Sequence, residues 1–195
     1  MPWFRRALAR YQNPWAYFLD SVKYMEPVFG RIRTLAPPPC RLIELGCGIG
    51  MAAAILSGYG YDVVGVDDDQ SVLWLAASMP WQRCSLRSLL HHGDVRQGFG
   101  GWNVATSLGV IEHEDHAMRR VMLERLREAG RVHVVCWPSP FGLAHDEPTM
   151  GERTLYLQEV RDECQSVGWT VIEAFGFGGP LPSSAPWSHC IIGGR

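Results

Sequence analysis

The sequence predicts an α/β fold in which a mostly parallel, seven-stranded sheet is covered on both faces by helices. From about residue 40, short runs rich in Val, Ile and Leu alternate with longer helix-like stretches, and repeated strand–helix units build parallel sheets. A glycine-rich turn follows the first of these runs directly. The last two runs follow one another without a helix between them, which predicts that the last strand is antiparallel.

The expected elements follow from apolar periodicity and from the positions of Gly and Pro. We expect strands at residues 41–45, 61–67, 88–92, 102–108, 131–137, 169–175 and 187–192. We expect helices between them at residues 50–57, 70–79, 116–129 and 152–167, and a loop after the fifth strand.

The residues before the first strand predict a helical arm. One helix is expected at 3–10, and a second from Pro14 to just before Gly30, broken at Pro27. Because Ala36-Pro37-Pro38-Pro39 is a stiff linker, we divide the chain into an arm or lid, residues 1–36, and one domain, residues 37–195.

Composition excludes several classes of function. Hydrophobic residues make up 47% and charged residues 19%, as in ordinary globular domains. The net charge of −2 argues against a nucleic-acid partner. Six cysteines without a C-x-x-C pair predict no metal site and a reduced, cytoplasmic protein. No apolar run is long enough to span a membrane. The oligomeric state is left open.

The glycine turn predicts a nucleotide-like cofactor. Glu44 and Leu45 run into Gly46-Cys47-Gly48-Ile49-Gly50, a G-x-G-x-G pattern at the end of the first strand. Glycines there let the backbone approach a ligand closely. Asp67 ends the second strand about 20 residues after Gly46, the spacing at which an acid binds ribose hydroxyls in dinucleotide folds.

Two details favour S-adenosylmethionine over a nicotinamide cofactor. A nicotinamide fold needs G-x-G-x-x-G, but here the third glycine, Gly50, comes one place early, with Met51 in its position. Glu44 precedes the first glycine by two residues. A carboxylate there repels a pyrophosphate but suits the ammonium of an amino acid.

The chain resembles the class I S-adenosylmethionine-dependent methyltransferases, particularly the small UbiE-like type 11/12 group that acts on small molecules. The resemblance is carried by four motifs that occur in the same order as in that family. The resemblance covers about residues 40–192 and implies a Rossmann-like fold. The motifs are Ile43-Glu44-Leu45-Gly46-Cys47-Gly48-Ile49-Gly50, Val64-Gly65-Val66-Asp67, Gly93-Asp94-Val95 and Ser107-Leu108-Gly109-Val110-Ile111-Glu112-His113.

The resemblance implies a set of cofactor-binding residues. The glycines flank the methionine moiety, Glu44 orders its amino group, and Asp67 binds the ribose with a share for Asp68. Asp94 accepts from the adenine amino group, Val95 packs on the ring, and Leu108 lies near the sulfonium. Tyr17 is expected on a lid over the cofactor. The full set is Glu44, Gly46, Cys47, Gly48, Gly50, Asp67, Asp68, Asp94, Val95, Leu108 and Tyr17. Asp69 is expected to cap the following helix.

Catalytic and acceptor residues are less sharply defined. His113 is our first candidate for a general base, although a structural role is equally compatible with its position; His145, after the fifth strand, is the second candidate. Tyr11, Trp15 and Trp137 are the aromatic residues expected to enclose the acceptor. We expect Trp74, Trp81, Trp102 and Trp169 to pack in the core.

Methyl transfer to a small-molecule acceptor is therefore the expected activity, at an oxygen, nitrogen or carbon that the motifs do not specify. One alternative is an enzyme that uses S-adenosylmethionine differently, as a lyase or intramolecular cyclase. The others are a non-catalytic subunit that keeps the fold, and a nicotinamide oxidoreductase, which Glu44, Gly50 and Met51 disfavour.

Overall fold

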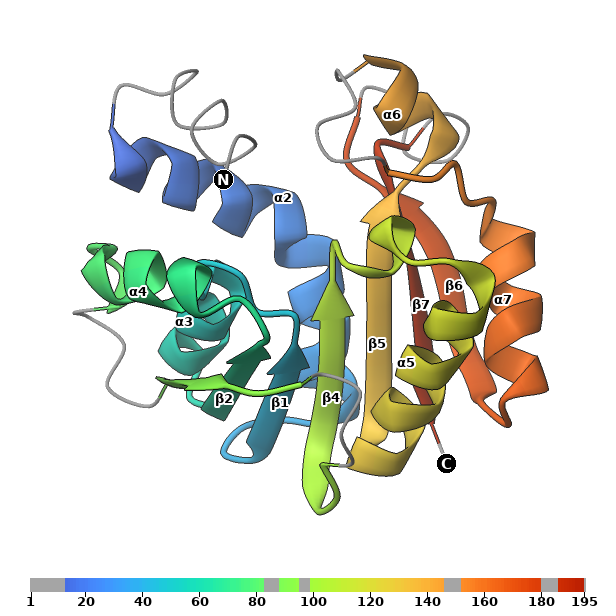
Figure 1. Cartoon of the computed structure of the whole chain (residues 1–195), viewed down its shortest axis with the longest axis horizontal. Helices are drawn as coiled ribbons and strands as arrows, with labels where there is room; N and C mark the ends of the chain where they lie inside the picture. The colour runs from blue at the N-terminus through green and yellow to red at the C-terminus, as the bar shows by residue number, and fades with distance from the viewer. Residues whose placement is uncertain (1–12, 83–87, 95–98, 146–151, 180–185, 195) are drawn as a thin grey trace.

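The computed structural model describes residues 13–82, 88–94, 99–145, 152–179 and 186–194. It contains a single sheet with helices on both faces (Figure 1). The strands are β1 (Arg41–Leu45), β2 (Asp62–Asp67), β3 (Ser88–His92), β4 (Trp102–Leu108), β5 (Gly130–Pro138), β6 (Thr170–Phe177) and β7 (Ser188–Gly194). The helices are α2 (Pro14–Leu35), α3 (Met51–Gly58), α4 (Gln70–Ser78), η2 (Ile111–His113), α5 (His116–Ala129), α6 (Pro140–His145) and α7 (Leu157–Ser166).

The strand order confirms the predicted fold class. The seven strands are arranged β3-β2-β1-β4-β5-β7-β6, and all neighbours pair in parallel except β7, which is antiparallel to both β5 and β6. The direction of the strand order reverses between β1 and β4. In open α/β sheets, ligands bind outside the carboxyl ends of the strands at such a switch point, and the glycine turn follows β1 there.

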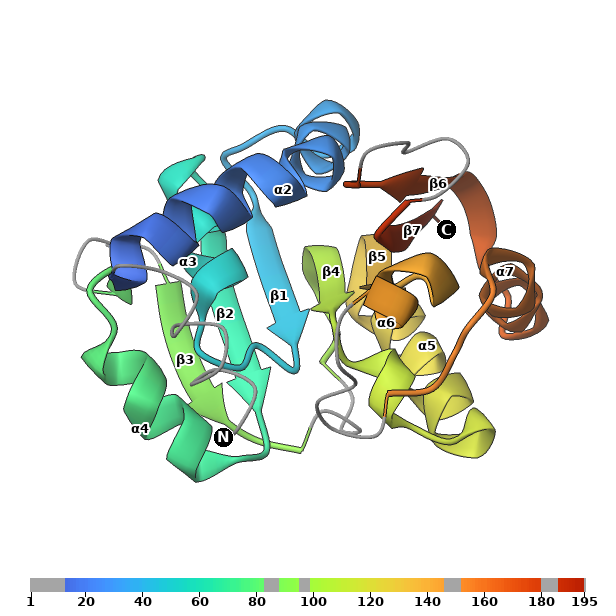
Figure 2. The same cartoon turned by 90° about the horizontal axis from the view of Figure 1, so that it is seen from above.

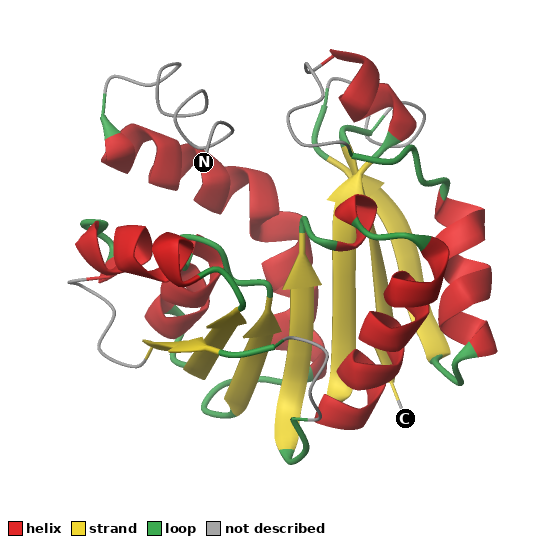
Figure 3. Ribbon diagram, in the orientation of Figure 1, coloured by secondary structure: helices red, strands yellow, loops and turns green. Residues whose placement is uncertain are grey.

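Successive residues of the central strands enter two separate cores, as expected for a sheet that is buried on both faces. Ile43 and Ala105 pack against α5 and α7, whereas Leu42 and Val104 pack against α2 and α3. Figure 2 shows the two sets of helices on opposite faces of the sheet, and Figure 3 distinguishes the strands, helices and connecting loops.

The predicted break at Pro27 is wrong, because α2 continues through it to Leu35. Asn13 caps the helix by accepting from the Ala16 N–H, and Pro14 occupies the first turn, where its missing N–H costs nothing. Pro27 removes one interior hydrogen bond. Directly after it, Val28 and Phe29 are fully buried against the sheet, and this packing holds the second half of the helix in place.

The expected helix at 152–167 is confirmed only from Leu157 onward. Before it, the Arg153 N–H donates to the Glu112 carbonyl, and the Leu155 carbonyl accepts from the Trp137 indole. These backbone groups bond to the body of the sheet and are therefore not available for helical bonds. The loop expected after β5 contains the short helix α6.

The tryptophans expected in the core differ in their burial. Trp81 and Trp169 are buried, and Trp102 is half-buried beneath the Arg41 guanidinium. The prediction for Trp74 is wrong: its side chain is 72% exposed. It lines a surface groove with Leu89, between α4 and the edge strand β3. The short α4 is covered on one side only.

A buried ion pair joins the two helices on the α5 face. The Arg119 guanidinium donates to both oxygens of Glu163, at 3.0 and 2.6 Å, and His116 lies 2.7 Å from the same carboxylate. Burial opposes ionisation of Glu163, but the hydrogen bonds from Arg119 and His116 outweigh it and lower its pKa. The pair fixes α7 against α5. In the part of the chain that is described, no helix is long and apolar enough to cross a membrane.

Candidate functional site

The glycine turn is built from three residues with left-handed backbone conformation. Gly46, Gly48 and Gly50 have φ values of 75°, 53° and 70°, which L side chains rarely adopt. The N–H groups of Gly46 and Cys47 both donate to the Val66 carbonyl. The turn is therefore tied to β2 from its first residue.

The surroundings of the three glycines differ. A Cβ at Gly46 would lie 2.5 Å from a methyl group of Val110, and one at Gly50 would lie 2.2 Å from the Gln82 amide and 3.0 Å from Leu90. A Cβ at Gly48 would meet no atom within 4 Å. Gly46 and Gly50 therefore serve close packing, whereas Gly48 borders open space that a ligand can approach.

Asp67 holds the middle of the turn. Its Oδ2 accepts from the Gly48 N–H at 2.8 Å, and its Oδ1 accepts from the Asp69 N–H at 3.0 Å. Asp69 caps α4 by accepting from the N–H groups of Ser71 and Val72, which confirms its predicted role. Asp68 is exposed beside them. The predicted ribose acid therefore also builds the turn that it faces.

Glu44 is a buried carboxyl group at the same end of β1. The residue is 2% exposed, and its Oε2 has no hydrogen-bond partner. Burial raises the pKa of Glu44 to about 8; a hydrogen bond from the Ala53 N–H opposes this rise, and the charge of Asp67 adds to it. A buried carboxyl with an unused oxygen is uncommon in folded proteins, and such an oxygen can accept from a donor or pair with a cation that arrives from outside.

Trp81 and Gln82 support the turn from behind, and the sequence analysis missed this role. The Trp81 indole donates to the Ile49 carbonyl at 3.2 Å, and the Gln82 amide donates to the Gly50 carbonyl at 2.8 Å. Phe18 of α2 stacks on Trp81 at 5.5 Å between ring centroids. No local pattern in the sequence signals these long-range contacts.

The segment after β4 closes the other side of the turn. Val110 fits against Gly46, and η2 follows with Glu112 and His113. His113 is one-third exposed, and its Nε2 lies 4.0 Å from Glu112 Oε1. Leu108, the last residue of β4, is half-buried. The structure therefore brings the strand-four motif to the glycine turn, as the resemblance implies.

The remaining predicted residues are distributed around this edge of the sheet. Asp94 is half-buried and follows Gly93, whose N–H donates to the Asp67 carbonyl. Cys47 is buried with its thiol against Gly65, and burial raises its pKa, so it is not a nucleophile. Val95 and Tyr11 lie outside the described residues, and His145 ends α6 with its side chain outside them.

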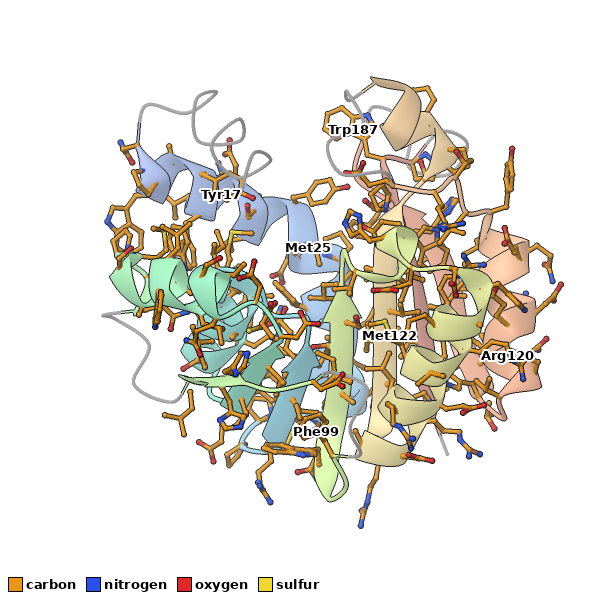
Figure 4. The ribbon with its side chains drawn as sticks, in the orientation of Figure 1. Tyr17, Met25, Phe99, Arg120, Met122 and Trp187 are labelled. Atoms are coloured by element: carbon orange, nitrogen blue, oxygen red, sulfur yellow. The ribbon has the colours of Figure 1, made fainter. Side chains whose placement is uncertain are left out.

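The predicted aromatic residues have different surroundings. Trp137 is 1% exposed and belongs to the core beneath α5 and α7, so its contacts are those of a packing residue. Trp15 is 41% exposed and meets Phe18 edge-on. Tyr17 is half-buried against the cluster that contains Ile49 of the turn. Figure 4 shows Tyr17 and Met25 on the α2 side of the upper end of β4, and Trp187 on the α6 side.

Buried polar atoms without hydrogen-bond partners gather at this edge. Besides Glu44 Oε2, they include Ser107 Oγ near the end of β4, Glu112 Oε2 after it, and His189 Nδ1 at the start of the antiparallel β7. Burial lowers the pKa of His189, which keeps it neutral. Such groups cost stability, and their position at the carboxyl edge is typical of a ligand site.

Comparison with known proteins supports the fold assignment. No family model matches the sequence, and no curated protein matches it. Among solved structures, magnesium protoporphyrin IX methyltransferase from Synechocystis PCC 6803 with bound SAH is 16% identical, with a TM-score of 0.74 over 98% of this chain and 92% of that one. The methyltransferase domain of bacterial CtHen1 is 19% identical, with a TM-score of 0.73 over 90% of this chain and 99% of that one.

An S-adenosylmethionine-dependent methyltransferase from Clostridium acetobutylicum ATCC 824 is 10% identical, with a TM-score of 0.71 over 88% of this chain and 90% of that one. The chain therefore has the class I methyltransferase fold, with a Rossmann-like sheet and an antiparallel seventh strand. At these identities the similarity shows the fold alone.

The residues at the turn fit an adenosine cofactor that carries an amino acid. The turn offers open space at Gly48, an unused buried carboxyl oxygen at Glu44, and the Asp67 carboxylate facing the same turn. In contrast, the main-chain N–H groups of Gly46, Cys47 and Gly48 are already bonded within the protein. Those three groups are therefore not free to bind a pyrophosphate.

Substitution of the glycines tests this division of roles. Gly46→Ala should lower the free energy of unfolding by about 3 kcal/mol, because left-handed strain and the clash with Val110 add. Gly48→Ala should lower the free energy of unfolding by only about 1 kcal/mol, because the left-handed backbone strain is not accompanied by a clash. Urea unfolding measures both, and Val110→Ala should recover part of the Gly46→Ala loss. Equal costs at the two positions would contradict the assigned packing role.

Proposed function

We propose that this chain binds S-adenosylmethionine and transfers its methyl group to a small-molecule acceptor. The observation that carries the proposal is the buried Glu44 carboxyl, whose Oε2 is unpaired beside the turn that Asp67 holds. The fold, and neighbours of the same fold solved with bound SAH and SAM, support the same choice of cofactor.

In this proposal, each part of the turn holds one part of the cofactor. Glu44 binds the ammonium, Asp67 accepts from the ribose hydroxyls with a contribution from Asp68, and Asp94 accepts from the adenine amino group. Leu108 and Tyr17 border the same space. When bound, S-adenosylmethionine supplies an electrophilic methyl group on a sulfonium. The chain's own contribution is to orient the two reactants and to exclude water.

We assign the base, where the acceptor needs one, to His113. It ends η2, the short helix after β4, and is one-third exposed, so it can pass a proton to solvent. The arm helix α2 is held on the glycine turn through Phe18 and Trp81. That contact supports Tyr17, one residue before Phe18, as part of a lid over the cofactor.

Cofactor affinity should depend on pH through Glu44. Because the pKa of Glu44 is about 8 in the unliganded chain, the carboxyl is mostly protonated at pH 6 and must lose a proton to pair with an ammonium. The association constant for S-adenosylhomocysteine should therefore rise about tenfold between pH 6 and pH 7, rise less steeply near pH 8, and level off about one pH unit above the pKa.

Isothermal titration calorimetry across this range measures the effect, and Glu44→Gln is the matched control. The variant should bind more weakly at pH 8, with a nearly flat pH dependence. An identical pH slope in wild type and Glu44→Gln would show that Glu44 is not the group that binds the ammonium.

The reaction type is tested by the product. Incubation with S-adenosylmethionine and a small-molecule library, followed by mass spectrometry, should give S-adenosylhomocysteine only when an acceptor is present. Methylthioadenosine from the cofactor alone would instead indicate lyase or cyclase chemistry, because the carbon–sulfur bond to the aminobutyrate chain is then the one that breaks. Binding without either product across the library would indicate a non-catalytic subunit.

A further inference from the structure

Glu112 is a second buried carboxyl group with an unpaired oxygen, and the proposed cofactor site does not use it. The residue lies in η2 and is 2% exposed, and its Oε2 makes no hydrogen bond. Burial raises the pKa of Glu112 to about 8; its own backbone N–H opposes the rise, and Glu152 adds to it. Its main chain already has a structural bond, since the carbonyl accepts from the Arg153 N–H.

Glu44 and Glu112 share one signature at one edge of the sheet. Each is almost fully buried, has an Oε2 without a partner, and follows or ends a strand at the switch point. Burying such a group costs several kcal/mol unless it is paired. Within the described residues, each of the two carboxyl groups thus keeps one oxygen without a hydrogen-bond partner, and one cofactor ammonium accounts for only one of them.

The position of Glu112 places it on the acceptor side. Its Oε1 lies 3.6 Å from where a Cβ on Gly109 would be, and Gly109 is exposed at the end of β4. An atom at that position would therefore be in van der Waals contact with the carboxyl. The next residue, Val110, fits against Gly46 of the cofactor turn.

The charges around Glu112 favour a cation. Among the described residues, the ionisable groups recorded beside it are His113, whose Nε2 lies 4.0 Å from its Oε1, and Glu152. Together with Glu112 itself, this makes two acids and one imidazole, which attract an ammonium and repel a carboxylate or a phosphate. A neutral alcohol gains only an ordinary hydrogen bond there, which is weaker than a charge-assisted one.

We propose that Glu112 binds the amino group of the acceptor, so that the acceptor is an amine-bearing small molecule. That this amine is a methyl acceptor rests on the proposed methyltransferase function. The binding of an amine by Glu112 does not depend on that function. At neutral pH, Glu112 releases its proton to the solvent as the ammonium binds, and an ammonium–carboxylate pair forms. No covalent bond is made or broken in this step.

A matched ligand series tests the proposal. Benzylamine, 2-phenylethylamine and tryptamine are titrated against benzyl alcohol, 2-phenylethanol and tryptophol by calorimetry, with the chain saturated with S-adenosylhomocysteine. At pH 7 we expect at least one amine to bind about tenfold or more tightly than its alcohol. Repeating the titration in buffers of different ionisation enthalpy should show close to one proton released per amine bound.

Glu112→Gln keeps the size of the side chain and should remove both the amine preference and the proton release. If no amine binds below about 10 mM, if alcohols bind equally well, or if the preference survives in Glu112→Gln, the proposal is overturned. The wild-type proton release stands as a test even if Glu112→Gln does not fold. If S-adenosylhomocysteine itself fails to bind, the proposed function fails, and the same amine titration on the unliganded chain still decides the role of Glu112.

Discussion

The hydrogen bond from the Gly48 N–H to the Asp67 carboxylate is the constraint on which the site depends. It joins the end of β2 to the middle of the turn that leaves β1, at the point where the strand order reverses. Around it, Trp81 and Gln82 bond to the turn from behind, and Val110 packs against its first glycine. The turn therefore keeps three left-handed glycines in a fixed shape before any ligand is present, which lowers the entropy that binding must overcome.

The electrostatics of the site follow from burial rather than from clustering of charge. Glu44 and Glu112 are isolated from water at the carboxyl edge of the sheet, and burial raises the pKa of each to about 8. A neutral carboxyl costs less to bury than a charged one, so the unliganded fold tolerates both. Each becomes a strong and selective partner only for a group that brings a positive charge. Such an arrangement discriminates between ligands by charge as well as by shape.

Most of the sheet could be predicted from the sequence, because buried parallel strands appear in it as short apolar runs with Gly and Pro between them. The positions of Glu44, Gly48 and Asp67 could also be predicted, since strand ends and turn glycines are local features. The predictions from sequence fail where contacts between residues far apart in the chain determine the local structure. Packing of Val28 and Phe29 carries α2 through Pro27, and bonds to Glu112 and Trp137 keep residues 152–156 out of α7. The support from Trp81 and the orphaned oxygen of Glu112 have no sequence signature, because each depends on what folds around it.

In the proposed function, the turn after β1 binds a cofactor that bears an ammonium and not one that bears a pyrophosphate. Calorimetric titration of the same protein sample with S-adenosylhomocysteine and with NADH tests it most directly. We expect saturable binding of S-adenosylhomocysteine at micromolar concentrations, and no binding of NADH in the same range. Binding of NADH with equal or greater affinity would contradict it.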